Sequence, residues 1–337
     1  MRAVLTARPA ARSAALLAAA LLAVPLFGAP AGAQVARNPS VAAFDPSFRE
    51  WVSLHQISAA SAAIMKDGHL VSTFGAGGMT AATPARIASL SKAITAVCIA
   101  QLVDSGRLSF TAPLSSVLPR TFAALGHPVD PRFRTITIEQ LLTHRSGLPR
   151  ETAGGAPARD LTGSFINILA TPLDSDPGTT MEYSNIGYLI LGVVIEAVTG
   201  STYERYCRTA ALAPMQASGT IDPQLRQRAS SGGWRVSAID YARFIQVFEP
   251  GSAGLGPLGR QWQDGLSGRR IYGLGIFISR TPQGIVLNHS GRLNRERSGS
   301  YVIKFPNGWT AVTTFAGDPR GHIADLRHRL ETAVARL

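Results

Sequence analysis

The sequence predicts an α/β fold of the α+β type, an antiparallel β-sheet flanked by N- and C-terminal helices and interrupted by a mostly helical inserted domain. Three observations lead to this prediction. A hairpin pattern occurs early, at residues 61–74, a long and mostly helical stretch follows, and alternating strand patterns return near residue 272. We expect the early and late strands to pair in one antiparallel sheet that the helical segment interrupts.

The first 33 residues have the pattern of a secretory signal peptide. A basic start with Arg2, Arg8 and Arg12 precedes an apolar stretch at 14–27, and Ala31-Gly32-Ala33 resembles a cleavage site. No Arg-Arg pair occurs in this segment, which favours the general export route over the twin-arginine route. The apolar stretch is short for a membrane span, so we expect cleavage after residue 33, a secreted or periplasmic protein, and no stable span in the mature form. An uncleaved anchor is the alternative.

The first expected elements of the mature chain are a helix and a hairpin. Asp45-Pro46 combines an N-cap residue with a proline at the first helical position, which predicts a helix to about His55. Strand patterns at 61–65 and 69–74 flank a turn at Asp67-Gly68, as in a β-hairpin.

The helical middle carries recognisable end signals. Gly106 and Gly200 are expected to stop helices, Thr137 with Gln140 resembles a capping box, and Ser237 is an expected N-cap. We therefore expect helices at 89–104, 138–143, 186–199, 202–211 and 238–247.

The last part of the chain changes character. Residues alternate between apolar and polar in several short runs, and Pro306-Asn307-Gly308 marks a turn between the last two. Apolar residues at helical spacing in 321–337 predict a terminal amphipathic helix. The expected strands lie at 272–279, 284–288, 300–305 and 310–315.

Composition limits the classes of function. Hydrophobic residues make up 45% and charged residues 16% of the 337 residues, which is typical of a packed globular protein. Cleavage of the signal peptide would remove three arginines and no acidic residue, lowering the formal charge from +12 to +9. An exported protein rich in arginine is a poor candidate for nucleic-acid binding, and its charge favours association with an anionic surface such as a cell envelope.

The two cysteines, Cys98 and Cys207, leave their pairing open. An exported protein can form one disulfide, but Cys98 lies in an apolar run that is expected to be buried. We expect two separate buried thiols, with a bridge as the alternative. Two cysteines cannot form a structural zinc site alone and no H-E-x-x-H motif occurs, so no metal or cofactor is expected.

Ser89 and Lys92 form an S-x-x-K motif at the head of a long apolar helix. Residues three apart lie on the same face of a helix, and unpaired N–H groups of the first turn surround the serine. The serine is suited to act as a nucleophile and the lysine to handle its proton. Among 33 lysines and arginines only three are lysines, and one of them is Lys92, where an arginine could not act as a base.

Two further motifs follow in a fixed order. Tyr183-Ser184-Asn185 precedes the helix at 186–199, and His289-Ser290-Gly291 ends a predicted strand. The order S-x-x-K, Y-x-N and [K/H]-[T/S]-G resembles the class C β-lactamase group of serine hydrolases, which includes D-alanyl-D-alanine peptidases and short-chain esterases. No G-x-S-x-G motif occurs, which argues against an α/β-hydrolase.

The resemblance extends over most of the mature chain. The connecting phrases at 137–149, 177–185 and 234–244 also match this group, so the similarity covers roughly 44–317. It implies a fold like that of serine β-lactamases and penicillin-binding proteins. Residues 34–337 would then form a single catalytic unit, with a sheet lobe from 44–85 and 230–337 and a mostly helical lobe from 86–229.

The resemblance also implies catalytic roles. Ser89 would be the nucleophile that accepts the acyl group, and Lys92 with Tyr183 would handle its proton. The sequence leaves open which of the two is the base. Asn185 would hold either the substrate or Lys92 through its amide.

The third motif would bind the substrate. His289 would replace the lysine of related proteins as a donor near the substrate carboxylate, and Ser290 would lie beside it. Gly291 would let the substrate lie against the strand, where a side chain would obstruct it. The backbone N–H groups of Ser89 and Arg292 would form an oxyanion hole.

Three features depart from this resemblance or stand outside it. The third motif continues with Arg292, Arg295 and Arg297 instead of a small Gly-rich turn, which we interpret as favouring an anionic substrate, with arginine-rich composition as the alternative. The segment 215–232 looks short for the group. His144 lies at an expected helix C-terminus, where a structural role in bonding the last carbonyls is favoured over catalysis.

The sequence therefore predicts an exported serine hydrolase that acts through an acyl-enzyme on Ser89. Its substrates would be β-lactams, D-Ala-D-Ala-type peptides, or small esters and amides, and its expected partners are such small-molecule or peptide substrates, besides the cell envelope that its charge favours. The alternatives are a penicillin-binding sensor that acylates without efficient turnover and a non-catalytic envelope module.

Overall fold

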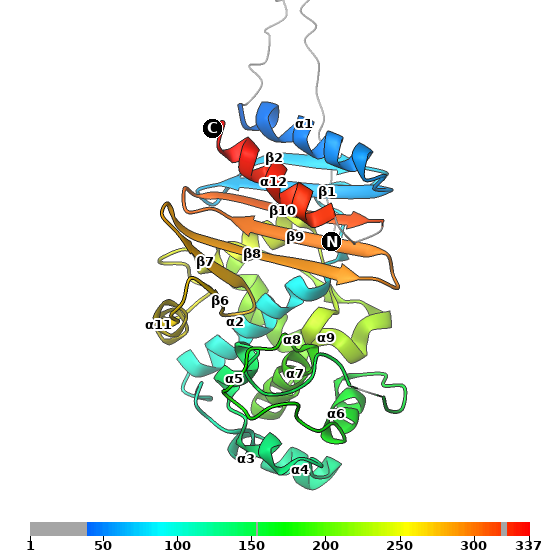
Figure 1. The fold of residues 1–337 in the computed structure, drawn as a ribbon, viewed down its shortest axis with the longest axis vertical. Helices are drawn as coiled ribbons and strands as arrows, with labels where there is room; N and C mark the ends of the chain where they lie inside the picture. Colours follow the sequence, from blue (N-terminus) through cyan, green and yellow to red (C-terminus); the bar gives the residue numbers. More distant parts are fainter. Residues whose placement is uncertain (1–38, 153, 318–321) are drawn as a thin grey trace, which may run out of the picture. The chain divides into compact units, whose positions relative to one another are not determined.

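A seven-stranded antiparallel sheet with the order β2-β1-β10-β9-β8-β7-β6 organises the fold (Figure 1). The computed structural model describes residues 39–152, 154–317 and 322–337, so the predicted signal peptide lies outside the described residues. Because β1 pairs with β10, the early hairpin and the late strands form one sheet, which confirms the predicted fold class. The strands are β1 (Ala59–Lys66), β2 (His69–Ala76), β6 (Arg270–Tyr272), β7 (Phe277–Thr281), β8 (Gly284–Leu293), β9 (Ser298–Lys304) and β10 (Trp309–Ala316).

A second, three-stranded sheet with the order β3-β5-β4 joins distant segments by short pairings. It consists of β3 (Ala85–Arg86), β4 (Thr220–Ile221) and β5 (Trp234–Val236). β3 leads directly into the segment that carries Ser89, so this small sheet ties that segment to residues 220–236.

The helices fall mainly between β2 and β6 in the chain. A 3₁₀ turn, η1 (Ala88–Leu90), precedes α2, and a turn of π-helix, Arg208–Leu212, follows α8. The α-helices are α1 (Pro39–Leu54), α2 (Ser91–Asp104), α3 (Leu114–Val117), α4 (Pro119–Leu125), α5 (Ile138–Leu142), α6 (Leu161–Leu169), α7 (Asn185–Thr199), α8 (Tyr203–Cys207), α9 (Ala229–Gly232), α10 (Ala238–Phe244), α11 (Pro257–Gly265) and α12 (His322–Val334).

Helices α1 and α12 lie together across one face of the large sheet (Figure 1). Phe48 and Trp51 of α1 and Leu326 of α12 share an apolar cluster with residues of β1, β9 and β10. The expected helix start at Asp45 is wrong, because α1 begins at Pro39. Phe44 is buried in the same cluster as Phe48 and Trp51, so the preceding turn packs against the sheet as well.

The residues that mark helix ends in the sequence were confirmed for α5, α7 and α10. Thr137 and Gln140 form the predicted capping box at the start of α5, and the Ser237 side chain caps α10. Gly200 ends α7 in the left-handed conformation, with φ of 67°. These signals act within a few residues, so the sequence alone is sufficient to place them.

The expected strand at 272–279 is wrong, because residues 273–276 leave the sheet between β6 and β7. Gly275 has φ of +72° and lies against the backbone of α2, where a Cβ atom would come within 2.4 Å of Ala93 N. This close approach anchors the β6–β7 connection on the first turn of α2, beside Lys92.

A disulfide joins Cys98 in α2 to Cys207 at the end of α8, with the two Cα atoms 5.7 Å apart. The expectation of two separate thiols is therefore wrong. Burial was predicted correctly for Cys98, but the packing of α2 against α8 brings the second cysteine to it. The bridge ties together two helices from the middle of the chain.

The part of the chain that the structure describes includes no single helix long and apolar enough to cross a membrane. One bent pair, Asn185–Thr199 with Tyr203–Met215, passes this test by length and composition together, at an angle of 85°.

Candidate active site

Ser89 lies in η1, one residue after a strained backbone position. Ala88 has φ of +48°, a conformation that costs a residue with a side chain about 1–2 kcal/mol. Contacts with Leu225 and Leu293 in a small apolar cluster offset this cost. The turn thereby presents Ser89, which is partly exposed, at the surface of a cleft.

Lys92 lies one turn further on, at the start of α2, and its side chain is completely buried. Its Nζ atom is 3.2 Å from Ser89 Oγ, 2.6 Å from Asn185 Oδ1 and 2.8 Å from the carbonyl oxygen of Ser231. Burial holds the pKa of Lys92 well below its usual value, and the charges of Arg150 and Arg228 lower the pKa further. Burial therefore favours the neutral form of the Lys92 amine.

The partners of Lys92 decide where its lone pair points. A neutral amine has two N–H bonds and one lone pair, whereas the Asn185 and Ser231 oxygens can only accept hydrogen bonds. These two oxygens take both N–H bonds. The remaining direction is toward Ser89 Oγ, so the serine hydroxyl can donate into the lone pair, as a general base requires.

Tyr183 comes from the loop before α7 and lies beside Lys92, whose Nζ is 5.0 Å from the centre of the phenol ring. Burial raises the pKa of Tyr183 to about 12. Its buried hydroxyl has no hydrogen-bond partner within the described part of the chain. Tyr183 is one of the residues that line the cleft, and a protonated phenol without a partner can donate to a substrate group that reaches it.

His289 lies in β8 and is buried, with 3% of its surface exposed. Its Nδ1 is 2.8 Å from the Ser290 carbonyl oxygen, which can only accept, so Nδ1 carries the proton. Its Nε2 lies 2.9 Å from the Tyr272 hydroxyl oxygen and then accepts a hydrogen bond from that hydroxyl. Burial lowers the pKa of His289 to about 3, which keeps the ring neutral.

This arrangement corrects the expectation that His289 donates to a substrate carboxylate. Both ring nitrogens bind the protein's own groups, and a neutral ring carries no charge to attract an anion. His289 contacts the cleft and lies 6.1 Å from Tyr183, between the ring centres, so it forms part of the wall behind the phenol.

Gly291 also serves a purpose other than the expected one. A Cβ atom there would lie 2.4 Å from the Ile87 carbonyl oxygen and 2.2 Å from Ser300 Oγ. The space beside Gly291 is thus filled by the turn that leads to Ser89, and not left for substrate as expected. The neighbouring Ser290 and Arg292 do line the cleft, and β8 and η1 are held side by side.

The cleft has a volume of about 1040 Å³ and is lined mostly by polar side chains. Arg150, Arg292 and Arg295 line it without an ion-pair partner among the described residues, and Arg228 pairs with Glu151 at 3.3 Å. Arg297 is not among the lining residues. The remaining lining residues are Ser89, Tyr183, Asn185, Gln224, Leu225, Gln227, Phe277, His289, Ser290, Leu293, Asn294 and Glu296.

The short segment 215–232 supplies one wall of this cleft. Within it, Pro223–Arg228 forms a 3₁₀ helix, and four of its residues line the cleft. The next helix, α9, provides the Ser231 oxygen that binds Lys92. This segment therefore contributes to the site despite its length.

His144 has a role that the sequence did not reveal. It is buried, and its Nδ1 accepts from the backbone N–H of Ser184, while its ring lies 4.3 Å from that of Tyr183. It supports the Y-x-N segment and does not bond the last carbonyls of its own helix through the side chain. Its position after α5 was visible in the sequence, but its contact with a segment 40 residues away was not.

Sequence reasoning missed Tyr272, Ser231 and Glu151. Tyr272 binds His289, the Ser231 carbonyl binds Lys92, and Glu151 accepts from the Asn185 amide at 2.5 Å. No motif marks these positions, and a backbone carbonyl leaves no signal in the residue type. Only the packing of separate segments brings them to the site.

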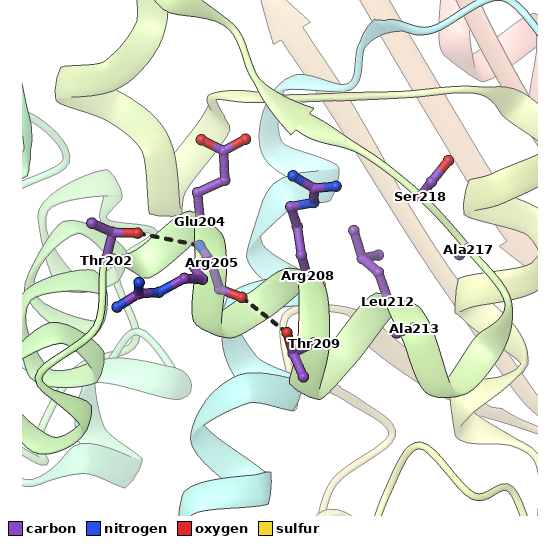
Figure 2. Close-up of a pocket in the computed structure, with 9 residues that line it drawn as sticks. All are labelled: Thr202, Glu204, Arg205, Arg208, Thr209, Leu212, Ala213, Ala217 and Ser218. Carbon is purple, nitrogen blue, oxygen red and sulfur yellow. Dashed lines mark hydrogen bonds between the residues drawn. The ribbon is translucent and has the colours of Figure 1, made fainter.

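A second pocket lies away from this cleft and lacks a candidate catalytic base. This pocket of about 540 Å³ beside α8 is shown in Figure 2, where Thr202 accepts from the Arg205 backbone N–H and Thr209 donates to the Arg205 carbonyl. None of its nine lining residues is a lysine or histidine that could serve as a base. Across the described residues, no group of three or more His, Cys, Asp or Glu side chains could hold a metal ion.

The fold and the three motifs define a class of protein. The Beta-lactamase family matches residues 44–334, and the chain belongs to this family of serine hydrolases. Penicillin-binding protein 4 of Amycolatopsis lactamdurans is 31% identical over 170 residues, which is 48% of this chain and 44% of that protein. Protein flp of Staphylococcus aureus is 30% identical over 154 residues, 44% of this chain and 30% of that protein. The matched part thus spans less than half of each relative.

Solved structures share the fold across nearly the whole described chain. The D-amino acid amidase from Ochrobactrum anthropi SV3, complexed with L-phenylalanine amide, superposes with a TM-score of 0.73. The alignment covers 88% of this chain and 99% of that chain at 18% identity. At this identity the likeness concerns the fold alone.

Proposed function

We propose that the protein is an exported serine hydrolase that cleaves amide or ester bonds through an acyl-enzyme on Ser89. One observation carries the proposal: a completely buried lysine with a lowered pKa lies 3.2 Å from the serine hydroxyl, and its other two partners can only accept. Such an arrangement activates a serine that would otherwise be a weak nucleophile.

The proposed reaction has two steps. Ser89 Oγ attacks the carbonyl carbon as its proton passes to Lys92, and the bond to the leaving group breaks as that group takes a proton from the Lys92–Tyr183 pair. Water then attacks the acyl ester, releasing the acid and restoring the serine hydroxyl. The N–H groups of Ser89 and Arg292 would stabilise the oxyanion, and losing one such donor typically costs about 2.7–4 kcal/mol.

Family membership supports three substrate classes: β-lactams, D-Ala-D-Ala-type peptides, and small esters or amides. The mature protein would be incubated with fluorescent penicillin, a chromogenic cephalosporin, p-nitrophenyl esters and D-amino acid amides, with Ser89→Ala as the control. Turnover that depends on Ser89 supports the hydrolase and ranks the substrates. Labelling without turnover would instead indicate a sensor, and no reaction with any probe would indicate a non-catalytic module.

The cleft further supports a preference for substrates with an anionic group, because three of its arginines lack an acidic partner among the described residues. Replacing Arg295 with glutamine should lower kcat/KM for an anionic ester about fivefold relative to a neutral ester, for about 1 kcal/mol of exposed charge pairing. Arg297→Gln is the matched control, since that residue belongs to the same turn but does not line the cleft. An equal effect of both substitutions would rule out this preference.

A further inference from the structure

Asn185 lies between Lys92, which donates a hydrogen bond to it, and Glu151, which accepts one from it. Its Oδ1 accepts from Lys92 Nζ at 2.6 Å, and its Nδ2 donates to Glu151 Oε1 at 2.5 Å. The second carboxylate oxygen of Glu151 accepts from Arg228 at 3.3 Å. A continuous hydrogen-bonded chain therefore runs from Arg228 through Glu151 and Asn185 to Lys92 and Ser89.

The direction of this chain depends on Glu151. An asparagine amide can present either its oxygen or its NH₂ group to a neighbour, whereas an ionised carboxylate can only accept. Glu151 therefore requires the NH₂ group of Asn185, which leaves the oxygen for Lys92. With the amide reversed, the NH₂ group would donate into the lone pair of Lys92 and remove the base from Ser89.

We propose that Glu151 is a positioning residue for acyl transfer, which orients the Asn185 amide so that the lone pair of Lys92 points to Ser89. This proposal rests on the proposed function and adds a residue that none of the three motifs includes. The Glu151 carboxylate also raises the pKa of Lys92, but burial lowers this pKa by more. Within the described residues Glu151 makes no hydrogen bond to Ser89, so it acts through Asn185.

Two substitutions of Glu151 separate this role from a general need for a polar side chain. In Glu151→Gln, Arg228 would attract the new amide oxygen, so the new NH₂ group would face Asn185 and favour the reversed orientation. In Glu151→Ala, water can fill the space and accept from Asn185, because the site is open to solvent. The less conservative alanine should therefore be the more active variant.

The kinetic test measures the acylation rate constant and the apparent dissociation constant for a p-nitrophenyl ester or fluorescent penicillin. We expect Glu151→Gln to lower the rate constant about 10- to 100-fold, a part of the 10²–10⁴-fold contribution of a general base, with little change in affinity. Glu151→Ala should lose less than about 10-fold. Glu182→Gln is the matched control, because it removes a carboxylate next to Tyr183 that does not line the cleft, and its rate should equal that of the wild type.

A second measurement does not require activity. The chain has only three lysines, so ¹³C labelling of lysine Cε gives three signals whose titration can be followed by NMR. Donation from a reversed Asn185 stabilises the neutral amine, so the pKa of Lys92 should decrease from wild type to Glu151→Ala to Glu151→Gln. The other two lysines should titrate as in the wild type.

The outcomes are distinct. A glutamine variant as fast as the wild type, or faster than the alanine variant, overturns the proposal, and so does a weaker affinity at an unchanged acylation rate. If the wild type acylates no probe, the proposed function fails, but the order of the Lys92 pKa values still tests the role of Glu151. An equal pKa in the two variants would then overturn the inference.

Discussion

Replacing Gly291 with alanine tests whether the close approach of β8 to the Ser89 turn is needed for activity. The new Cβ would lie 2.4 Å from the Ile87 carbonyl oxygen, whereas ordinary contacts begin at 3.4 Å. Ile87 O is a backbone atom that cannot rotate away, and it also accepts a hydrogen bond from the buried Ser300 hydroxyl. The strand and the turn must separate by about 1 Å, a misplacement that can cost about 10²-fold in rate.

We expect Gly291→Ala to lower kcat/KM about 100-fold. Overpacking should also lower the free energy of unfolding by about 1–3 kcal/mol. Ester hydrolysis and denaturant unfolding measure the two effects on the same preparation. The loss of activity should persist under conditions where the variant is fully folded.

Gly75→Ala is the matched control. Its Cβ would also lie 2.4 Å from a backbone carbonyl oxygen, that of Met79, but on β2 at the edge of the sheet. It should lower stability and leave kcat/KM unchanged. The reasoning would be refuted if Gly291→Ala kept the wild-type kcat/KM, or if both variants lost activity in proportion to their loss of stability.

Three further predictions concern the amine, the disulfide and export. First, kcat/KM should rise with pH through a limb well below pH 10.5, because burial lowers the pKa of Lys92 and the neutral amine is the base. The value of kcat/KM should not fall again until the pH nears the pKa of Tyr183, which is about 12. A limb at or above 10.5 in the pH–rate profile would contradict this. Second, replacing both Cys98 and Cys207 with alanine should lower the free energy of unfolding by about 3–5 kcal/mol, since the bridge closes a long loop. Equal stability of this variant and the wild type in denaturant would refute the stabilisation by the disulfide. Third, N-terminal sequencing of the exported protein should begin at Gln34, and recovery of uncleaved chain in the membrane fraction would point to an anchor.

Sequence patterns were reliable where the determining contacts are local. The hairpin of β1 and β2, the capping box of α5 and the glycine stop of α7 each depend on residues within a few positions of one another. The first motif is also local, because Ser89 and Lys92 are three residues apart at the start of a helix. These parts could be predicted because turn and cap geometry allows few residue types.

The pairing of the cysteines and the break between β6 and β7 required the tertiary structure. Cys98 and Cys207 are separated by 109 residues, and their pairing follows from the packing of α2 against α8. Residues 273–276 read as part of a strand, yet they leave the sheet to contact the backbone of α2. Both outcomes depend on neighbours that the local sequence does not contain.

By itself the sequence determined the order of the elements and the residue types that carry the proposed chemistry. The order of the three motifs was sufficient to indicate the family, and the structure places Ser89, Lys92, Tyr183 and Asn185 together at one cleft. Tertiary structure decided the state of each group: a neutral His289 bound at both nitrogens, a buried Lys92, and an Asn185 oriented by Glu151. The physical reason is that protonation and hydrogen-bond direction depend on burial and on partners from distant segments, which residue spacing does not encode.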